Sequence, residues 1–192
     1  MRLDLREIAR YMRMGRTLPE GALAERVTAL RDRALKVIRP ARTWRRFPIE
    51  GGAIISGGVR LDIAGTLARH IVGCRAAYLV CGTIGAAFDA FQRRVSVSSG
   101  ADALIAQAIG AALIEKLMDS VEDEIHGELA ENETLVERYS PGYGTFPLAA
   151  QRTLLALLDA PIKVGVSLTD TLLMVPSKSV SAIIGIRSAS AQ

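Results

Sequence analysis

Residues 138–147 gather more chemically useful side chains than any other stretch of the sequence. Their sequence, RYSPGYGTFP, carries one guanidinium, two phenols, two prolines and two glycines. Pro141 fixes one backbone torsion, while Gly142 and Gly144 allow positive φ or close backbone approach, and the aromatic rings offer stacking faces. This composition predicts a rigid loop suited to a small, planar, anionic ligand. The alternative is a proline–glycine turn whose aromatic rings only cover the edge of a core.

A second candidate group, Glu115, lies within the longest helical pattern, over residues 99–132. Glu115 shares one helix face with Asp119 and Glu122 because their spacings are four and three, so it could simply begin a solvated acidic stripe. It also follows a run of small residues in which Gly110 would allow close approach to the backbone. A carboxylate in that position could instead meet a cationic group of a ligand.

The elements that must position these residues follow from hydrophobic periodicity and from glycine and proline punctuation. The apolar stripe of the long helix is Ile105, Ile109, Leu113, Leu117, Val121 and Ile125. Thr17 is expected to cap the second helix, with Pro19 in its first turn. The remaining predicted helices span residues 3–14, 17–37, 62–72, 84–94 and 147–158, and the predicted strands span residues 43–50, 53–55, 77–83, 162–166, 172–175 and 180–186.

The helix over residues 147–158 is expected to turn its leucines inward and to end at Pro161. The inward set is Leu148, Leu154, Leu155 and Leu158. Strands scattered among helices favour an α+β fold with a largely antiparallel sheet. The glycine turn after residue 81 matches neither GxGxxG nor GxxxxGK[ST], so the sequence predicts neither a Rossmann fingerprint nor a P-loop.

The length and hydropathy of the chain indicate one domain outside the membrane. A chain of 192 residues is enough for one sizeable core. The uncharged runs at 76–88 and 103–114 fall short of the roughly 20 residues that span a bilayer. The arginine-rich start has no apolar centre typical of a secretory signal. We therefore predict a cytoplasmic protein without a transmembrane helix.

Metal chemistry is not favoured by the cysteine and histidine content. Cys74 and Cys81 are the only cysteines, and their spacing does not match a CxxC motif. His70 and His126 lie far apart in the sequence. We therefore predict two buried thiols and no metal site.

The net charge of +4 hides two segments of opposite sign. Residues 1–46 carry thirteen Arg or Lys against five Asp or Glu, whereas residues 99–138 carry ten acidic residues against two basic ones. The basic segment contains few aromatic residues and no recognised nucleic-acid-binding motif. It is therefore expected to be solvated or to dock a partner, and no nucleic acid is predicted as a ligand.

Several short motifs in the second half of the chain occur together in a known family. RYSPGY at 138–143 is followed by LTDT at 168–171, MVP at 174–176 and SVS at 179–181. In this order they resemble the activation domain of cobalamin-dependent methionine synthase, and the likeness extends over roughly residues 70–187. The whole chain looks like a short stand-alone relative of that domain.

The resemblance implies a C-shaped α+β domain that binds S-adenosylmethionine. Its largely antiparallel, twisted sheet would be flanked by helices, and a helical N-terminal extension would precede it. The chain would then divide into an extension at 1–40, the activation-like domain at 41–187 and a frayed tail at 188–192.

The resemblance also implies which residues bind the cofactor. Arg138 would pair with the methionine carboxylate, Ser140 would approach the adenine through its main chain, and Gly142 and Tyr143 would shape and close the site. Glu115 matches the carboxylate that the family carries on a helix. A forked guanidinium–carboxylate contact and negative charge near a sulfonium both suit this ligand.

The resemblance implies partner proteins because the chain lacks a cobalamin-binding motif of its own. The D-x-H-x-x-G cobalamin signature fails because Ala68 stands where the aspartate would precede His70. Cobalamin would therefore be supplied by a corrinoid-binding protein or methyltransferase, and a flavodoxin-like reductant is a further partner that the family allows. The chain would support methyl transfer to that cobalt, as a reactivating module or as part of a split methionine synthase.

An alternative function remains open at this point. The family's aspartate near the start of the domain has no recognisable counterpart here, and Thr145 and Phe146 replace a different pair. The alternative is a non-catalytic docking partner of a corrinoid protein that no longer binds S-adenosylmethionine. Both interpretations make the chain a methyltransferase component and leave open whether it is itself an enzyme.

Overall fold

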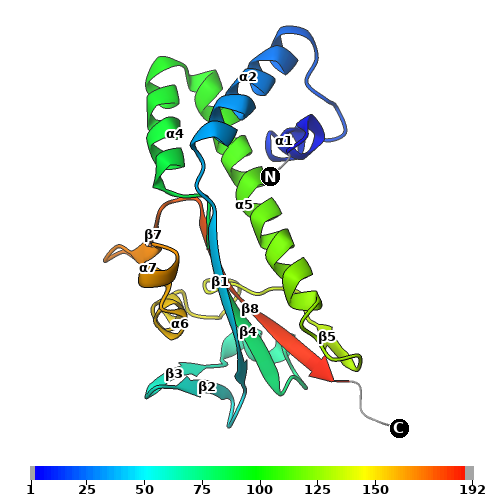
Figure 1. Cartoon of the computed structure of the whole chain (residues 1–192), viewed down its shortest axis with the longest axis vertical. Helices are drawn as coiled ribbons and strands as arrows, with labels where there is room; N and C mark the ends of the chain where they lie inside the picture. Colours follow the sequence, from blue (N-terminus) through cyan, green and yellow to red (C-terminus); the bar gives the residue numbers. More distant parts are fainter. Residues whose placement is uncertain (1–2, 189–192) are drawn as a thin grey trace.

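The structure is a computed structural model that describes residues 3–188. Helices and strands are interspersed along the chain, and the strands pair in antiparallel fashion (Figure 1). The helices are α1 (Leu5–Tyr11), α2 (Gly21–Val37), α3 (Gly65–His70), α4 (Ala86–Ser98), α5 (Gly100–His126), α6 (Ala150–Leu158) and α7 (Ala160–Lys163). The strands are β1 (Ala41–Pro48), β2 (Ala53–Ser56), β3 (Val59–Asp62), β4 (Ala76–Thr83), β5 (Glu133–Leu135), β6 (Ser167–Leu168), β7 (Met174–Val175) and β8 (Ser179–Ser188).

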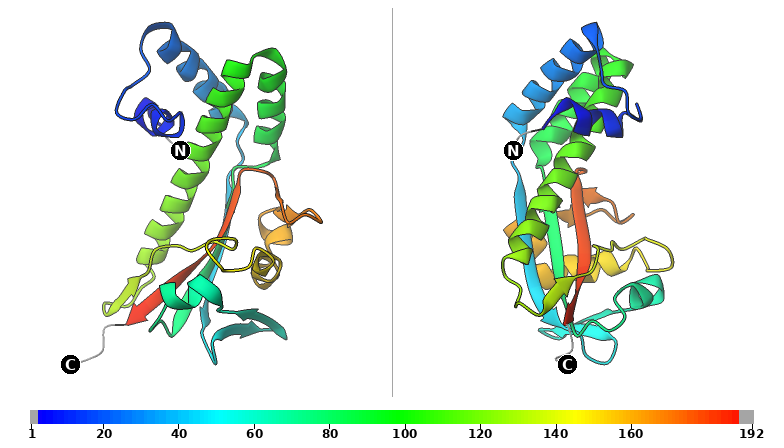
Figure 2. Two further views of the ribbon diagram at one scale, coloured as in Figure 1. Left: turned by 180° about the vertical axis from the view of Figure 1, so that it is seen from behind. Right: turned by 90° about the vertical axis from the view of Figure 1, so that its right-hand side faces the viewer.

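The main sheet has the strand order β1-β4-β8-β5, and all of its pairs are antiparallel. Helix α5 lies along one side of this sheet and α6 lies on the other (Figure 2). The central strand β4 is uncharged and buried along almost its whole length because both of its faces are covered. The predicted α+β class with a largely antiparallel sheet is therefore confirmed.

Alternate side chains of the central strands serve two separate cores. Val80 and Ala182 face α5, where they pack with Met118 and Val121. On the opposite face, Leu79, Cys81 and Ile183 pack with residues of α6 such as Leu154 and Leu158. Because successive side chains of a strand point to opposite faces of the sheet, alternate residues of each strand pack against α5 or against α6.

A third core holds the helical end of the molecule together. Helices α1 and α2 pack against α4 and α5 around Leu30, Phe88, Ile109 and Leu113 (Figure 1). Gly110 is required in this packing because a Cβ there would lie 2.5 Å from the ring of Phe88. Every residue of the predicted apolar stripe on α5 is buried. The long helix therefore joins the N-terminal helices to the sheet.

The two oppositely charged segments of the sequence partly neutralise each other within the molecule. Basic residues of the N-terminal segment pair with acidic residues of α5 and β5: Arg26 with Asp102, Arg42 with Glu124 and Arg46 with Glu133. In the reverse sense, Lys116 of α5 pairs with Glu7 of α1 at 2.7 Å. The basic segment is thus used for intramolecular packing, in addition to what it exposes to solvent.

Three local predictions near the start of the chain were wrong. Thr17 does not cap α2 and Pro19 does not lie in its first turn, because the helix begins only at Gly21, which has φ of 51°. Glu20 precedes the helix without a side-chain cap. The helix predicted from residue 62 begins only at Gly65. Residues 59–62 instead form β3, because Gly57 and Gly58 have positive φ and close a two-residue hairpin with β2.

Other errors concern the second half of the chain. The strand predicted at 162–166 is absent, because Asp159 adopts φ of 54° and Pro161 lies in the first turn of α7. Helix α6 begins at Ala150, so Leu148 precedes it and is 42% exposed. The short strand β5 was not predicted. Ser188 still belongs to β8, and the rest of the predicted frayed tail lies outside the described residues.

Within residues 3–188, no helix has the length and apolar character needed to cross a bilayer. The cytoplasmic localisation and the division of the chain at residue 40 stay predictions.

Candidate functional site

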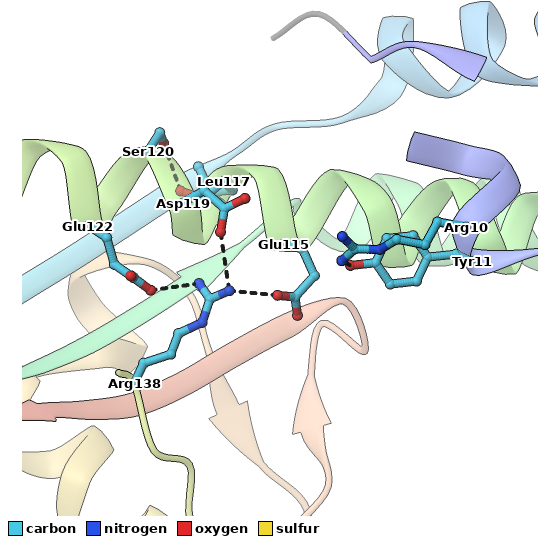
Figure 3. Close-up of polar contacts among 8 residues, drawn as sticks. All are labelled: Arg10, Tyr11, Glu115, Leu117, Asp119, Ser120, Glu122 and Arg138. Atoms are coloured by element: carbon cyan, nitrogen blue, oxygen red, sulfur yellow. Dashed lines mark hydrogen bonds and ion pairs between the residues drawn. The ribbon is translucent and has the colours of Figure 1, made fainter. Parts of the chain in front are cut away.

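Arg138 is held between the sheet and α5 by the strand that precedes it. The segment enters the sheet through β5, and Tyr139 then forms a two-way backbone bridge with Ile183 of β8, at 2.9 Å in each direction. In this arrangement the side chain of Arg138 projects toward α5 (Figure 3). The pairing of Tyr139 with β8 thus fixes the backbone next to Arg138, from which its side chain reaches α5.

Three carboxylates of α5 surround the guanidinium of Arg138. Nη2 donates to Glu115 Oε2 at 2.7 Å and to Asp119 Oδ1 at 3.2 Å. Glu122 Oε1 lies 3.1 Å from Nη1 (Figure 3). The predicted common face of Glu115, Asp119 and Glu122 is therefore confirmed, since all three reach one partner. We call Arg138 with these three carboxylates the Arg138 cluster.

The Arg138 cluster has more negative than positive charge. The side chain of Arg138 is 21% exposed, whereas Glu115 and Asp119 are 39% and 67% exposed. Nη1 is buried and makes no hydrogen bond within the described residues despite its proximity to Glu122. Burial raises the pKa of the Glu122 carboxyl, and Arg138 opposes this shift without cancelling it. The cluster can therefore accept a further cation at its exposed carboxylates.

Thr66 of α3 fixes the loop that follows Arg138. The hydroxyl of Tyr139 donates to Thr66 Oγ1 at 2.6 Å. The Thr66 hydroxyl in turn donates to the carbonyl of Tyr143 at 3.2 Å. A reciprocal pair of backbone-to-side-chain hydrogen bonds, each 3.1 Å long, joins Thr66 and Thr145. Sequence analysis missed Thr66 because its loop partners lie more than seventy residues further along the chain. No local pattern signals such a contact.

The loop glycines adopt the backbone conformations predicted for them. Gly142 has φ of 91° and Gly144 has φ of 53°. A Cβ on Gly144 would lie 2.6 Å from Thr66 Oγ1, so this glycine also permits close approach to α3. Gly142 N donates to the carbonyl of Phe146, and Tyr143 N donates to the carbonyl of Ser140. The loop is therefore rigid through its own hydrogen bonds.

The aromatic residues of the loop divide into two roles. Phe146 is buried in the core beneath the sheet, and Tyr139 packs partly against the same core, as the alternative of a structural turn requires. Tyr143 differs because it is 60% exposed, with its ring 5.7 Å from that of Tyr139 in an edge-on arrangement. Tyr143 thus offers a free stacking face.

The structure divides the five predicted site residues into two groups. Arg138 and Glu115 form an ion pair, whereas Ser140, Gly142 and Tyr143 lie on the loop that Thr66 holds. Over residues 3–188, no hydrogen bond or ion pair links these three residues to the Arg138 cluster. Their contact with a ligand stays a prediction.

The cysteines offer no reactive site. Cys81 is buried, and burial raises its pKa to about 12, so the thiol remains protonated at neutral pH. The prediction of two buried thiols is wrong for Cys74, which is partly exposed because it lies just before β4, although partial burial raises its pKa as well. Among the described residues, no group of three His, Cys, Asp or Glu side chains is arranged to hold a metal ion.

Comparison with known proteins identifies a family and a fold. The family model described as vitamin B12 dependent methionine synthase, activation domain, matches residues 88–191. A crystal structure of the MetH reactivation domain bound to AdoHcy has a similar fold, with a TM-score of 0.57 and 15% sequence identity over 90% of this chain and 69% of that chain. No curated protein sequence matches the chain.

Proposed function

This chain belongs to the family of vitamin B12-dependent methionine synthase activation domains, and we propose that it binds S-adenosylmethionine and supports methyl transfer to the cobalt of a corrinoid held by a partner protein. The observation that carries the proposal is the Arg138 cluster, in which three carboxylates face one guanidinium. Two of its four members, Arg138 and Glu115, are residues that the family resemblance assigns to the ligand.

The charges of the cluster complement those of the proposed ligand. S-adenosylmethionine carries a sulfonium and an ammonium, and both cations are stabilised by nearby negative charge. Glu115 and Asp119 have exposed carboxylates that could face these groups while Arg138 holds them in position. A carboxylate already fixed by an arginine requires little reorganisation when a cation arrives. The residues present therefore fit the ligand.

The loop would supply the surface for the nucleoside. Tyr143 has an exposed ring for stacking, and the positive φ of Gly142 brings the backbone to the surface without a side chain. Ser140 would contribute main-chain contacts, as the resemblance implies. Because Thr66 fixes this loop before any ligand binds, the entropy cost of ordering it is already met by folding.

The role of Arg138 follows from its partners. The resemblance assigns Arg138 to the ligand carboxylate, but this guanidinium could bind that group only by releasing one of its present carboxylates. We therefore propose that Arg138 acts chiefly by positioning Glu115 and Asp119.

The chemistry of the reaction comes from the bound cofactor and from the partner. When bound, S-adenosylmethionine would supply the methyl group, and this chain would hold it toward the corrinoid and exclude competing orientations. The proposed partner is a corrinoid-binding protein or methyltransferase, with a flavodoxin-like protein as the reductant.

A second candidate function is a docking partner that does not bind S-adenosylmethionine. It is favoured by one observation, namely that Arg138 already has carboxylate partners and so is not free for the ligand carboxylate. Copurification with a corrinoid protein, without binding of S-adenosylmethionine, would support this candidate.

Calorimetric titration with S-adenosylmethionine tests the proposal. The wild-type chain is expected to give saturable heat, and Glu115→Gln is expected to weaken binding about tenfold because it removes one charge near the ligand cations. Glu124→Gln is the matched control, since Glu124 lies on the same helix and pairs with Arg42 instead. Absence of saturable heat from the wild-type chain would reject the proposal in favour of the docking function.

A further inference from the structure

A small pocket separates helix α1 from the Arg138 cluster. Its volume is about 70 Å³, and its lining includes Glu7, Arg10 and Tyr11 of α1 together with Glu115, Lys116 and Asp119 of α5. Figure 3 shows Arg10 and Tyr11 of α1 beside α5, on the other side of Glu115 from Arg138. Glu115 therefore belongs both to the cluster and to this pocket.

Helix α1 is fixed in place beside the pocket. Ile8 and Ala9 are buried in the helical core, and Glu7 Oε1 accepts a hydrogen bond from Lys116 Nζ at 2.7 Å. Asp4 and Glu7 form a capping box at the start of the helix. The side chains of α1 that line the pocket thus project from a packed helix.

Arg10 lines the pocket with a guanidinium that has no acidic partner. Its Nη2 donates to the hydroxyl of Tyr11 at 3.0 Å, and its guanidinium carbon lies 5.1 Å from the centre of that ring. In the part of the chain that the structure describes, no carboxylate lies within ion-pair distance of Arg10. Glu7 and Lys116 neutralise each other, so they leave the charge of Arg10 unbalanced.

The two walls of the pocket therefore carry opposite charges. The α1 wall presents the guanidinium of Arg10, and the α5 wall presents the carboxylates of Glu115 and Asp119. This is the charge pattern that complements an α-amino acid, whose ammonium and carboxylate are joined to one carbon. A volume of about 70 Å³ holds a few water molecules, so it suits a small charged headgroup but excludes a nucleoside.

We propose that α1 completes the ligand site, with Arg10 binding the carboxylate of the ligand's amino-acid portion while Glu115 and Asp119 face its ammonium. Tyr11 orients Arg10 through its hydroxyl and ring. The inference rests on the proposed function, because it takes S-adenosylmethionine as the ligand whose headgroup enters the pocket. It makes the N-terminal helices part of the binding site.

Titration of the wild-type chain and two variants with two probes tests this role. The probes are S-adenosylmethionine and 5′-methylthioadenosine, which keeps the nucleoside and lacks the amino-acid portion. The wild-type chain is compared with Arg10→Gln and with Arg6→Gln, which removes the same charge from an exposed position on α1 that lines a different pocket. Both substitutions lie outside the core, so thermal unfolding should be unchanged.

The expected result is a selective loss in one variant. Arg10→Gln should bind S-adenosylmethionine at least tenfold more weakly than the wild type, because a charge-assisted hydrogen bond is lost. Its affinity for 5′-methylthioadenosine should equal that of the wild type, and Arg6→Gln should match the wild type with both probes.

Other results would overturn the inference in distinguishable ways. A wild-type affinity for S-adenosylmethionine retained in Arg10→Gln would exclude Arg10 from the site while leaving the proposed function intact. Tighter binding by Arg10→Gln would mean that α1 competes with the ligand, and an equal loss with both probes would mean a purely structural effect. A wild-type chain that binds neither probe would reject the proposed function and this inference together.

Discussion

Arg46 contacts one carboxylate, whereas Arg138 contacts three. Arg46 of β1 forms a forked pair with Glu133 of β5, with N–O distances of 2.9 and 2.6 Å, so that two donors meet two acceptors of one carboxylate. Arg138 instead faces three carboxylates, and its Nη2 is shared between Glu115 and Asp119. The first site is electrically balanced, whereas the second has an excess of negative charge.

The pKa values of the carboxyls follow this difference. The hydrogen bonds from Arg46 lower the pKa of Glu133, and a backbone hydrogen bond from Ala130 contributes to the same shift. Burial raises the pKa of Glu122, because its share of Arg138 does not offset desolvation. The balanced pair is expected to stabilise the fold, whereas we propose that the unbalanced cluster keeps negative charge available for a cationic ligand.

The largest expected effect comes from removing the shared cation of the Arg138 cluster. Arg138→Ala leaves three carboxylates close together and should lower the free energy of unfolding by about 2 kcal/mol, less than for a fully buried pair because Asp119 is 67% exposed. Urea unfolding at pH 7 measures this loss. Adding Glu122→Gln to Arg138→Ala should recover part of it, and equal stabilities of wild type and Arg138→Ala would contradict the account.

A smaller effect is expected at the balanced pair. Glu133→Gln should cost about 1 kcal/mol at pH 7 because a forked, well-aligned contact is lost. Since the folded pKa of Glu133 is lowered, this stabilisation is present above the ordinary carboxyl pKa and is lost as the pH falls through the folded value. Unfolding of wild type and variant between pH 2 and 7, about the range in which carboxyls titrate, should show the two curves converging in acid. A difference in the free energy of unfolding that does not change with pH would mean that the charge of Glu133 contributes nothing to stability.

The smallest effect has the opposite sign. Because the folded pKa of Glu122 is raised, its ionisation opposes folding above that pKa, and the penalty disappears as the pH falls below the ordinary carboxyl value. Glu122→Gln should therefore gain a few tenths of a kcal/mol at pH 7, roughly the size of a surface ion-pair effect, and nothing in acid. The same pH series measures it, and a clear loss of stability at pH 7 would show that Glu122 is a net stabilising partner of Arg138.

Local patterns predicted the elements on either side of the site better than the contacts between them. The stripe of α5 and the common face of its three carboxylates follow from helical spacing alone. That Arg138 is their partner depends on the pairing of β5 with β8, which brings together distant parts of the chain. Strand β5 itself has only three residues, so its sequence carries little signal apart from its partner.

In the loop at 138–147, too, the sequence predicted local backbone conformation but not the contacts with distant residues. Its glycines predicted positive φ correctly, because that requirement is local. The contact with Thr66, and the division between buried Phe146 and exposed Tyr143, depend on α3 and on the core beneath the sheet. The position of α1 beside Glu115 likewise follows from tertiary packing of the N-terminal helices.

The central claim is that the excess carboxylates of the Arg138 cluster bind the cations of S-adenosylmethionine. The most direct test compares the affinities of S-adenosylmethionine and S-adenosylhomocysteine at low salt, since the two differ by the methyl group and the sulfonium charge. We predict that the wild-type chain binds S-adenosylmethionine about five- to tenfold more tightly, and that the double variant Glu115→Gln with Asp119→Asn loses this preference. Equal affinity of the wild-type chain for the two ligands would contradict the claim that these carboxylates also stabilise the sulfonium.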